Sequence, residues 1–135
     1  MNLGIIQGRL SPPVEGFQET PSDWKREIEV MSRLNLSHME WIVTQNSFST
    51  NPIFYENLIE YPIHSICADN LVDSKIDNFD FVVHNLAPIC RAAVKNEIPY
   101  VTIPLLEESC VMNENTRSSF KSILGELVMT FPDLQ

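Results

Sequence analysis

Four short apolar segments separated by helical patterns constrain the fold of this chain more than any other feature. The segments are rich in the residues that favour β-strands, and apolar residues recur at helical spacing between them. Strands that alternate with helices are joined by right-handed crossovers and therefore lie parallel. The sequence thus predicts an α/β fold of about four parallel β/α units. The strand segments are LGIIQGRL (3–10), HMEWIV (38–43), IHSICAD (63–69) and YVTIPLL (100–106).

Three amphipathic stripes predict the helices, because their apolar residues fall on one side of a helical wheel. Pro88 lies inside the second stripe and has no N–H to donate, so it should kink or split that helix near Asn85. Between the second and third strands NPIFYENLIEYP has room for only about two helical turns, so we expect an abbreviated crossover there. The stripes are Trp24, Ile28, Met31 and Leu34; Phe79, Val82, Leu86, Ile89 and Ala93; and Phe120, Ile123, Leu124, Leu127 and Val128.

Composition and charge narrow the class of protein. The chain has 135 residues, of which 44% are hydrophobic, and this suits one globular domain over 1–135. Its formal charge of −9 would repel nucleic acid and anionic lipid surfaces. No run approaches the roughly 18 apolar residues of a spanning helix, and Cys67, Cys90 and Cys110 fit no disulfide or zinc pattern. We expect a cytoplasmic protein with reduced thiols and with neither nucleic-acid nor membrane partners.

Polar side chains occur where the first and third apolar segments end. Because side chains alternate along a strand, Gln7 and Arg9 share the face of Leu3 and Ile5 in the first segment. Asp69 ends the third segment by the same alternation. If these faces point into a barrel, Gln7, Arg9 and Asp69 lie at its C-terminal mouth, where barrel enzymes bind their substrates.

Two further carboxylates complete this candidate site. Glu40 lies on the second segment and could join the group, whereas its neighbour Trp41 would face the helices. Glu107 follows the fourth segment, where it suits either a site residue or a solvated loop charge. The same residues also allow a purely structural interpretation, in which Arg9 pairs with Glu40 or Asp69 to close the mouth.

Other chemical motifs have no support in the sequence. His38, His64 and His84 form neither HxH nor HExxH, and we expect packing roles for them, with His64 on the helix-facing side beside Ile66. No GxSxG turn, GxGxxG loop or phosphate-binding P-loop is present. Nucleophilic triads and nucleotide-binding loops are therefore excluded as hypotheses.

Taken in order, QGRLSPP, EWI, ICAD and TIP resemble the sugar-phosphate isomerase/epimerase group of the xylose-isomerase-like (β/α)8 barrels. QGRLSPP and ICAD are the most specific of these motifs. A complete barrel of this kind has eight strands. The resemblance therefore implies that the four units correspond to the N-terminal half of a (β/α)8 barrel.

The resemblance also implies a function, that of a sugar or sugar-phosphate isomerase or epimerase. In the complete family a divalent metal (Mn, Mg or Co) polarises a carbonyl and a carboxylate base moves a proton through an enediolate. The metal ligands of the family lie on later strands that have no counterparts here, so we assign no catalytic residue. We expect no tightly bound metal and negligible isomerase activity from this chain alone. The implied substrate-binding residues are Gln7, Arg9, Glu40, Asp69 and Glu107.

An alternative from a different class is a noncatalytic half-barrel that binds a small polyol or assembles with another chain. Half of a barrel exposes inner apolar side chains and two unpaired strand edges, and both favour association. We expect a homodimer, or an assembly with a missing C-terminal half. The expected inner apolar residues are Leu3, Ile5, Ile42 and Cys67.

Overall fold

The computed structural model describes residues 2–12 and 20–135, and it contains a four-stranded parallel sheet in the order β1-β2-β3-β4. This confirms the predicted α/β class with parallel strands. The strands are β1 (Gly4–Ile6), β2 (His38–Ile42), β3 (Ile63–Cys67) and β4 (Tyr100–Thr102). The helices are α1 (Trp24–Arg33), α2 (Pro52–Tyr55), α3 (Phe79–Lys95) and α4 (Glu114–Thr130), with the 3-10 turns η1 (Asp69–Leu71) and η2 (Glu107–Ser109).

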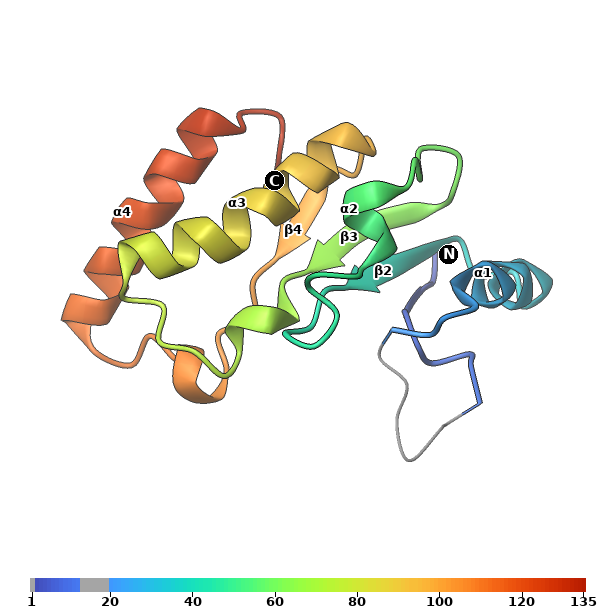
Figure 1. Cartoon of the computed structure of the whole chain (residues 1–135), viewed down its shortest axis with the longest axis horizontal. Helices are drawn as coiled ribbons and strands as arrows, with labels where there is room; N and C mark the ends of the chain where they lie inside the picture. The colour runs from blue at the N-terminus through green and yellow to red at the C-terminus, as the bar shows by residue number, and fades with distance from the viewer. Residues whose placement is uncertain (1, 13–19) are drawn as a thin grey trace.

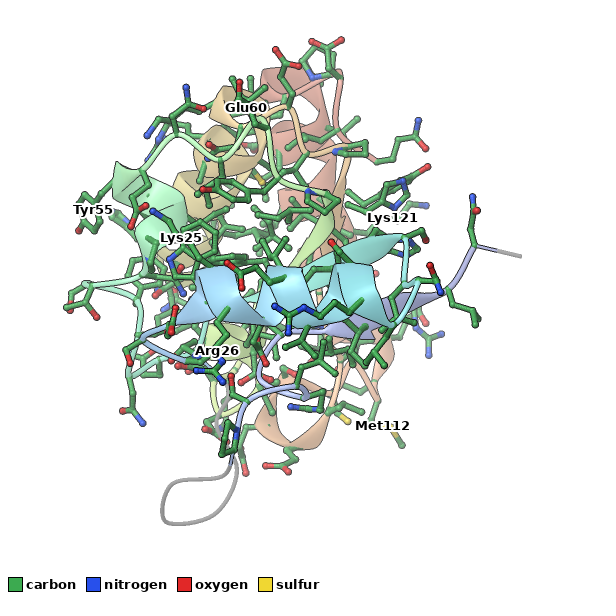
Figure 2. All side chains as sticks on the ribbon, turned by 90° about the vertical axis from the view of Figure 1, so that its right-hand side faces the viewer. Lys25, Arg26, Tyr55, Glu60, Met112 and Lys121 are labelled. Carbon is green, nitrogen blue, oxygen red and sulfur yellow. The ribbon has the colours of Figure 1, made fainter. Side chains whose placement is uncertain are left out.

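The helices pack against one face of the sheet. In Figure 1, α2 and α3 lie in front of the strands and α4 lies beside α3. Figure 2 shows α1 crossing in front of the strands, with Lys25 and Arg26 on this helix. Met39, Trp41 and Ile66 point from the strands into the core beneath the helices and are fully buried. The opposite face, which we call the open face, carries partly or fully exposed side chains of the four strands.

Trp41 shows why β2 holds the centre of the core. Its ring meets that of Trp24 edge to face at 5.2 Å, and its Nε1 donates to Oδ1 of Asn51 at 2.8 Å. The same Asn51 oxygen accepts from the N–H of Ile53 and caps α2. The predicted orientation of Trp41 toward the helices is confirmed.

The structure refines two helix predictions. α3 is continuous from Phe79 to Lys95 with Pro88 inside it, so the helix is not split near Asn85. Buried residues on either side of the proline, Leu86 and Ile89, hold this helix against the sheet. α2 is even shorter than expected, with four residues.

The side chains of strand β1 point to the opposite faces of the sheet from those predicted. Ile5 packs against the helix-side core, and Ile6 is 40% exposed on the open face. Leu3, Ile5, Gln7 and Arg9 therefore do not form an inward-facing row. The strand ends at Ile6, and the following turn includes Gly8 with a φ of 84°, so strand alternation does not extend to Gln7.

A register shift between β2 and β3 reorients His64. Met39 lies opposite Ile63, but the next residue, Glu40, lies opposite Ser65, so His64 is an extra residue in β3. Its ring lies 4.9 Å from that of His38 and 5.0 Å from that of Tyr100. His64 therefore lies on the open face, and its predicted helix-facing position is wrong.

The last residue of the chain pairs with the outer edge of β4. The N–H of Gln135 donates to the carbonyl of Pro99 at 2.9 Å, and its carbonyl accepts from the N–H of Val101 at 3.1 Å. These two bonds are the pattern of a parallel ladder in which Gln135 lies opposite Tyr100. The edge of β4 thus accepts a segment parallel to itself.

Candidate functional site

The open face gathers polar side chains from neighbouring strands. Glu40 is half-buried at its centre, opposite Ile6 on one side and Ser65 on the other. It borders a shallow hollow of about 240 Å³, whose floor includes Gly4. A Cβ at Gly4 would collide with the ring of His38, so a larger residue here would require that ring to move. The hollow is lined by Gly4, Ile5, Ile6, His38, Glu40 and Ser65.

Cys67 connects Glu40 with Asp69 electrostatically. Burial, together with the smaller effects of the negative charges of Glu40 and Asp69, raises the pKa of the Cys67 thiol to about 12. Both carboxylates therefore lie close enough to influence one thiol. Glu40 and Asp69 thus both lie within electrostatic range of Cys67, the last residue of β3.

Asp69 begins η1 and is separated from the end of β3 by Ala68. Burial raises the pKa of its carboxyl above the usual value, and the nearby charge of Asp73 raises it as well. The ion pairs of the described residues lie elsewhere, at Lys25–Glu56, Arg33–Glu29 and Arg117–Glu114. Within this part of the chain neither Glu40 nor Asp69 takes part in an ion pair, so both carboxylates can accept hydrogen bonds from a ligand.

Gln7 is used by the protein itself. Its side chain is buried, and its Oε1 accepts from the N–H of Ile42 at 3.0 Å. Its own N–H donates to the carbonyl of Glu40 at 2.9 Å. Gln7 therefore extends the pairing of β1 and β2 beyond the end of the strand. These contacts give its side chain a structural role.

Arg9 lies in the turn after β1, and α1 anchors this turn. Glu27 on α1 is buried, and its carboxylate accepts from the N–H groups of Gly8 at 2.8 Å and Leu10 at 2.9 Å. These bonds fix the backbone on both sides of Arg9, whose side chain is exposed. The turn is thus held in place while the guanidinium faces solvent.

Glu27 is the functional scaffold residue that the sequence prediction missed. A signal for it exists in the first helical stripe, because Glu27 lies three residues after Trp24 and four before Met31. An acidic residue inside an apolar stripe needs a buried partner. Here the partners are backbone N–H groups, which no side-chain motif reveals.

Glu107 lies on the exposed turn η2, with its backbone in the left-handed region at a φ of 50°. The buried Ser109 fastens this turn, because its N–H donates to the carbonyl of Val72 at 3.1 Å and its Oγ lies 2.9 Å from the carbonyl oxygen of Pro104, to which it donates. η2 is therefore tied to the segment that follows η1. Glu107 itself remains exposed.

Asn70, beside Asp69, has an unusual buried side chain. Its backbone N–H donates to the carbonyl of Val43 at 2.8 Å, but its side-chain amide has no hydrogen-bond partner among the described residues. An unpaired buried amide costs about 1–3 kcal/mol. Nothing in the sequence distinguishes Asn70 from an ordinary turn asparagine.

The described residues do not form a complete metal site. Across 2–12 and 20–135, no three His, Cys, Asp or Glu side chains gather in a way that could hold a metal ion. A hard divalent cation prefers several converging oxygen ligands. Glu40 and Asp69 alone do not meet this requirement.

Comparisons with known proteins identify no relative of this chain. Neither the protein-family models nor the curated proteins contain a match to the sequence. In the described part of the chain no helix has both the length and the apolar character needed to cross a membrane.

Proposed function

We propose that this chain is the substrate-binding, N-terminal half of a (β/α)8 barrel related to the sugar and sugar-phosphate isomerases and epimerases. Its open face would form part of the barrel lumen, with Glu40 and Asp69 accepting hydrogen bonds from the hydroxyl groups of a polyol. Arg9, exposed in the turn after β1, would supply a cation for a phosphate or a further hydroxyl. Gln7 holds β1 to β2 behind this site.

The strand order supports a barrel-type architecture. A sheet in the order β1-β2-β3-β4 grows in one direction only, and its helices cover one face. A doubly wound sheet reverses its strand order at a switch point and carries helices on both faces. The observed order is the one that a sheet needs in order to curl with its helices outside.

One observation carries the proposal, namely that the charges of Glu40 and Asp69 both raise the pKa of the Cys67 thiol at the end of β3. Two carboxylates near the carboxyl end of parallel strands, outside any ion pair of the described chain, suit a ligand rich in hydroxyl groups. Carboxylate oxygens accept hydrogen bonds from hydroxyls, and such charge-assisted bonds are stronger than neutral ones.

The proposed role is binding, and proton transfer is left to groups outside the described residues. No set of these residues forms a metal site, so no metal-dependent step is assigned to them. A second candidate function is a noncatalytic half-barrel that binds a polyol without turning it over. The buried roles of Gln7 and Glu27 support this candidate, because both polar groups serve the scaffold.

Binding and turnover can be tested separately on the purified 135-residue chain. Calorimetric titration with D-fructose 6-phosphate and with D-xylose measures binding, and the same sugars with Mn²⁺, Mg²⁺ or Co²⁺ test isomerisation. We expect measurable binding that weakens about tenfold in Glu40→Gln, because each lost charge-assisted bond contributes about 1.5–3 kcal/mol.

Glu60→Gln is the matched control, since Glu60 is an exposed carboxylate away from the open-face cluster. It should bind like the unmodified chain. Binding without turnover supports the noncatalytic candidate, and turnover supports the isomerase. Absence of binding by any sugar or sugar phosphate would contradict both.

A further inference from the structure

We propose that two copies of this chain close an eight-stranded parallel barrel, with β1 of each copy docked on β4 of the other. This inference depends on the half-barrel architecture and not on the identity of the sugar. A two-fold axis along the barrel would keep all strands parallel and would pair both free edges at once. The occupant of the β4 edge is therefore a second copy.

The β4 edge is already built to receive a parallel strand. Gln135 satisfies the carbonyl of Pro99 and the N–H of Val101. By strand alternation, the carbonyl of Val101 and the N–H of Ile103 point to the same edge, and no bond to either of them occurs among the described residues. A strand that displaces Gln135 can therefore bond to β4 over at least one more residue than Gln135 does.

The β1 edge carries matching groups. Residues 3, 5 and 7 of this segment direct their backbone groups toward β2, as the bonds of Leu3 and Gln7 to β2 and its flanks show. Gly4 and Ile6 consequently direct their N–H and C=O groups outward. β1 and β4 are the outer strands of the sheet that the described residues form, and an edge strand favours pairing with another chain.

An apolar groove beside β4 fits the side chain that this docking would deliver. The groove has a volume of about 100 Å³ and is lined by residues of α3, α4 and β4 and by the C-terminal segment, including Leu134 and Gln135, the residue that docking would displace. By alternation, Leu3 lies on the helix side of β1 with Ile5, yet it is 53% exposed in the single chain. Apolar residues that line the groove include Val101, Leu127 and Phe131.

The geometry of a closed barrel sets the register. A (β/α)8 barrel has a shear of about 8, so two-fold symmetry shifts the register by about four residues per half. Following the pairs from Ile6 through Glu40 and Ser65 leads to Tyr100. A shift of four residues from Ile6 then places the partner's Asn2 opposite Tyr100, in the position that Gln135 occupies in the single chain.

In this register the partner's Leu3 lies opposite Val101 and enters the groove. The partner's Gly4 lies opposite Thr102, where its backbone meets the carbonyl of Val101 and the N–H of Ile103. Docking thus exchanges the single-residue contact of Gln135 for a continuous ladder and buries a leucine that is otherwise exposed.

Charge gives the assembly a characteristic salt dependence. Each copy has a formal charge of −9, and closure places two copies of Glu40 and Asp69 around one lumen. Salt screens this repulsion. The dimer should therefore tighten as salt is added, whereas a dimer held by surface ion pairs would loosen.

Sedimentation velocity on the full chain, without sugar, tests the proposal over about 1 to 100 micromolar protein. We expect a concentration-dependent species of twice the 15.4 kDa chain mass. Leu3→Asp should weaken the dimer at least about tenfold, because the carboxylate would enter an apolar groove. Leu34→Asp is the matched control, since Leu34 is 57% exposed at the end of α1 and should leave the dimer unchanged.

Ile6→Pro tests the strand pairing itself. The N–H of Ile6 points away from β2, so proline, which lacks this N–H, suits the edge position in the single chain. Ile6→Val is the control, because valine keeps the N–H. Circular dichroism should show both variants folded, with only Ile6→Pro monomeric. A monomer at all concentrations, or a dimer that tolerates Leu3→Asp and Ile6→Pro, would overturn the proposal. Sugar binding is measured independently, so either proposal can fail alone.

Discussion

The carboxylate of Glu27 accepts the backbone N–H of Gly8 at 2.8 Å in a buried contact that ties α1 to the turn after β1. The second oxygen of Glu27 accepts from the N–H of Leu10 at 2.9 Å. Arg9 lies between these two anchor points. A single buried acid therefore fixes the backbone that carries the one cationic side chain of the candidate site.

Glu27→Ala should lower the free energy of unfolding by about 3 kcal/mol, because two hydrogen bonds to a charged acceptor disappear and a buried N–H is left unpaired. Urea denaturation measures the change. Glu27→Gln should lose about half as much, since its amide keeps one acceptor oxygen. Glu29→Ala is the control: this exposed residue pairs with Arg33 at 3.9 Å and should change stability by less than about 0.5 kcal/mol.

Gln7→Leu should destabilise the chain by about 1–3 kcal/mol, since the buried N–H of Ile42 would lose its acceptor. Gln45→Leu alters an exposed glutamine and should have little effect. Sugar binding, measured under conditions where Gln7→Leu is folded, should persist. Unchanged stability combined with lost binding would instead identify Gln7 as a direct ligand contact.

Cys67 should react slowly with iodoacetamide at pH 8, because a pKa of about 12 leaves little thiolate. Glu40→Gln removes one of the negative charges that raise this pKa and should accelerate the alkylation of Cys67. Peptide mass spectrometry resolves Cys67 from Cys90, whose pKa is raised to about 11 mainly by burial. An alkylation rate of Cys67 that is the same in Glu40→Gln and in the unmodified chain would show that Glu40 does not face the thiol.

Asp69 should make stability decrease as pH rises through its raised pKa. Its carboxyl has a higher pKa in the folded chain than an aspartate ordinarily has, so the folded state binds the proton more strongly than the unfolded state. Deprotonation therefore costs stability, and Asp69→Asn should melt at a slightly higher temperature than the unmodified chain at pH 7. The difference should shrink as pH falls below the raised pKa. The opposite trend would mean that the carboxylate is stabilised by a partner.

Much of the fold follows from patterns that the sequence carries locally. Apolar periodicity predicts the alternation of strands and helices, and the short segment before β3 predicts the brief α2. Trp41 faces the helices as alternation requires. These features depend on neighbouring residues, whose spacing a sequence displays directly.

The remaining features depend on contacts between distant segments. His64 changes face because one extra residue in β3 shifts its register against β2, and a shift of pairing leaves no local mark. Ile5 and Ile6 exchange their expected faces because β1 has only three residues, too few to establish its alternation from sequence. Glu27 and Gln7 bind backbone groups across the fold, so their partners appear only in three dimensions.

The account rests on the claim that the open face binds a polyol through Glu40 and Asp69. Titration of ¹⁵N-labelled chain with D-fructose 6-phosphate, followed by amide NMR, tests this claim most directly. We predict that the amide signals of Glu40, Ser65, Cys67 and Asp69 shift together and saturate. Glu40→Gln should raise the sugar concentration needed for saturation, whereas Glu60→Gln should not. Shifts confined to the helices, or no saturable shift with any sugar or sugar phosphate, would contradict it.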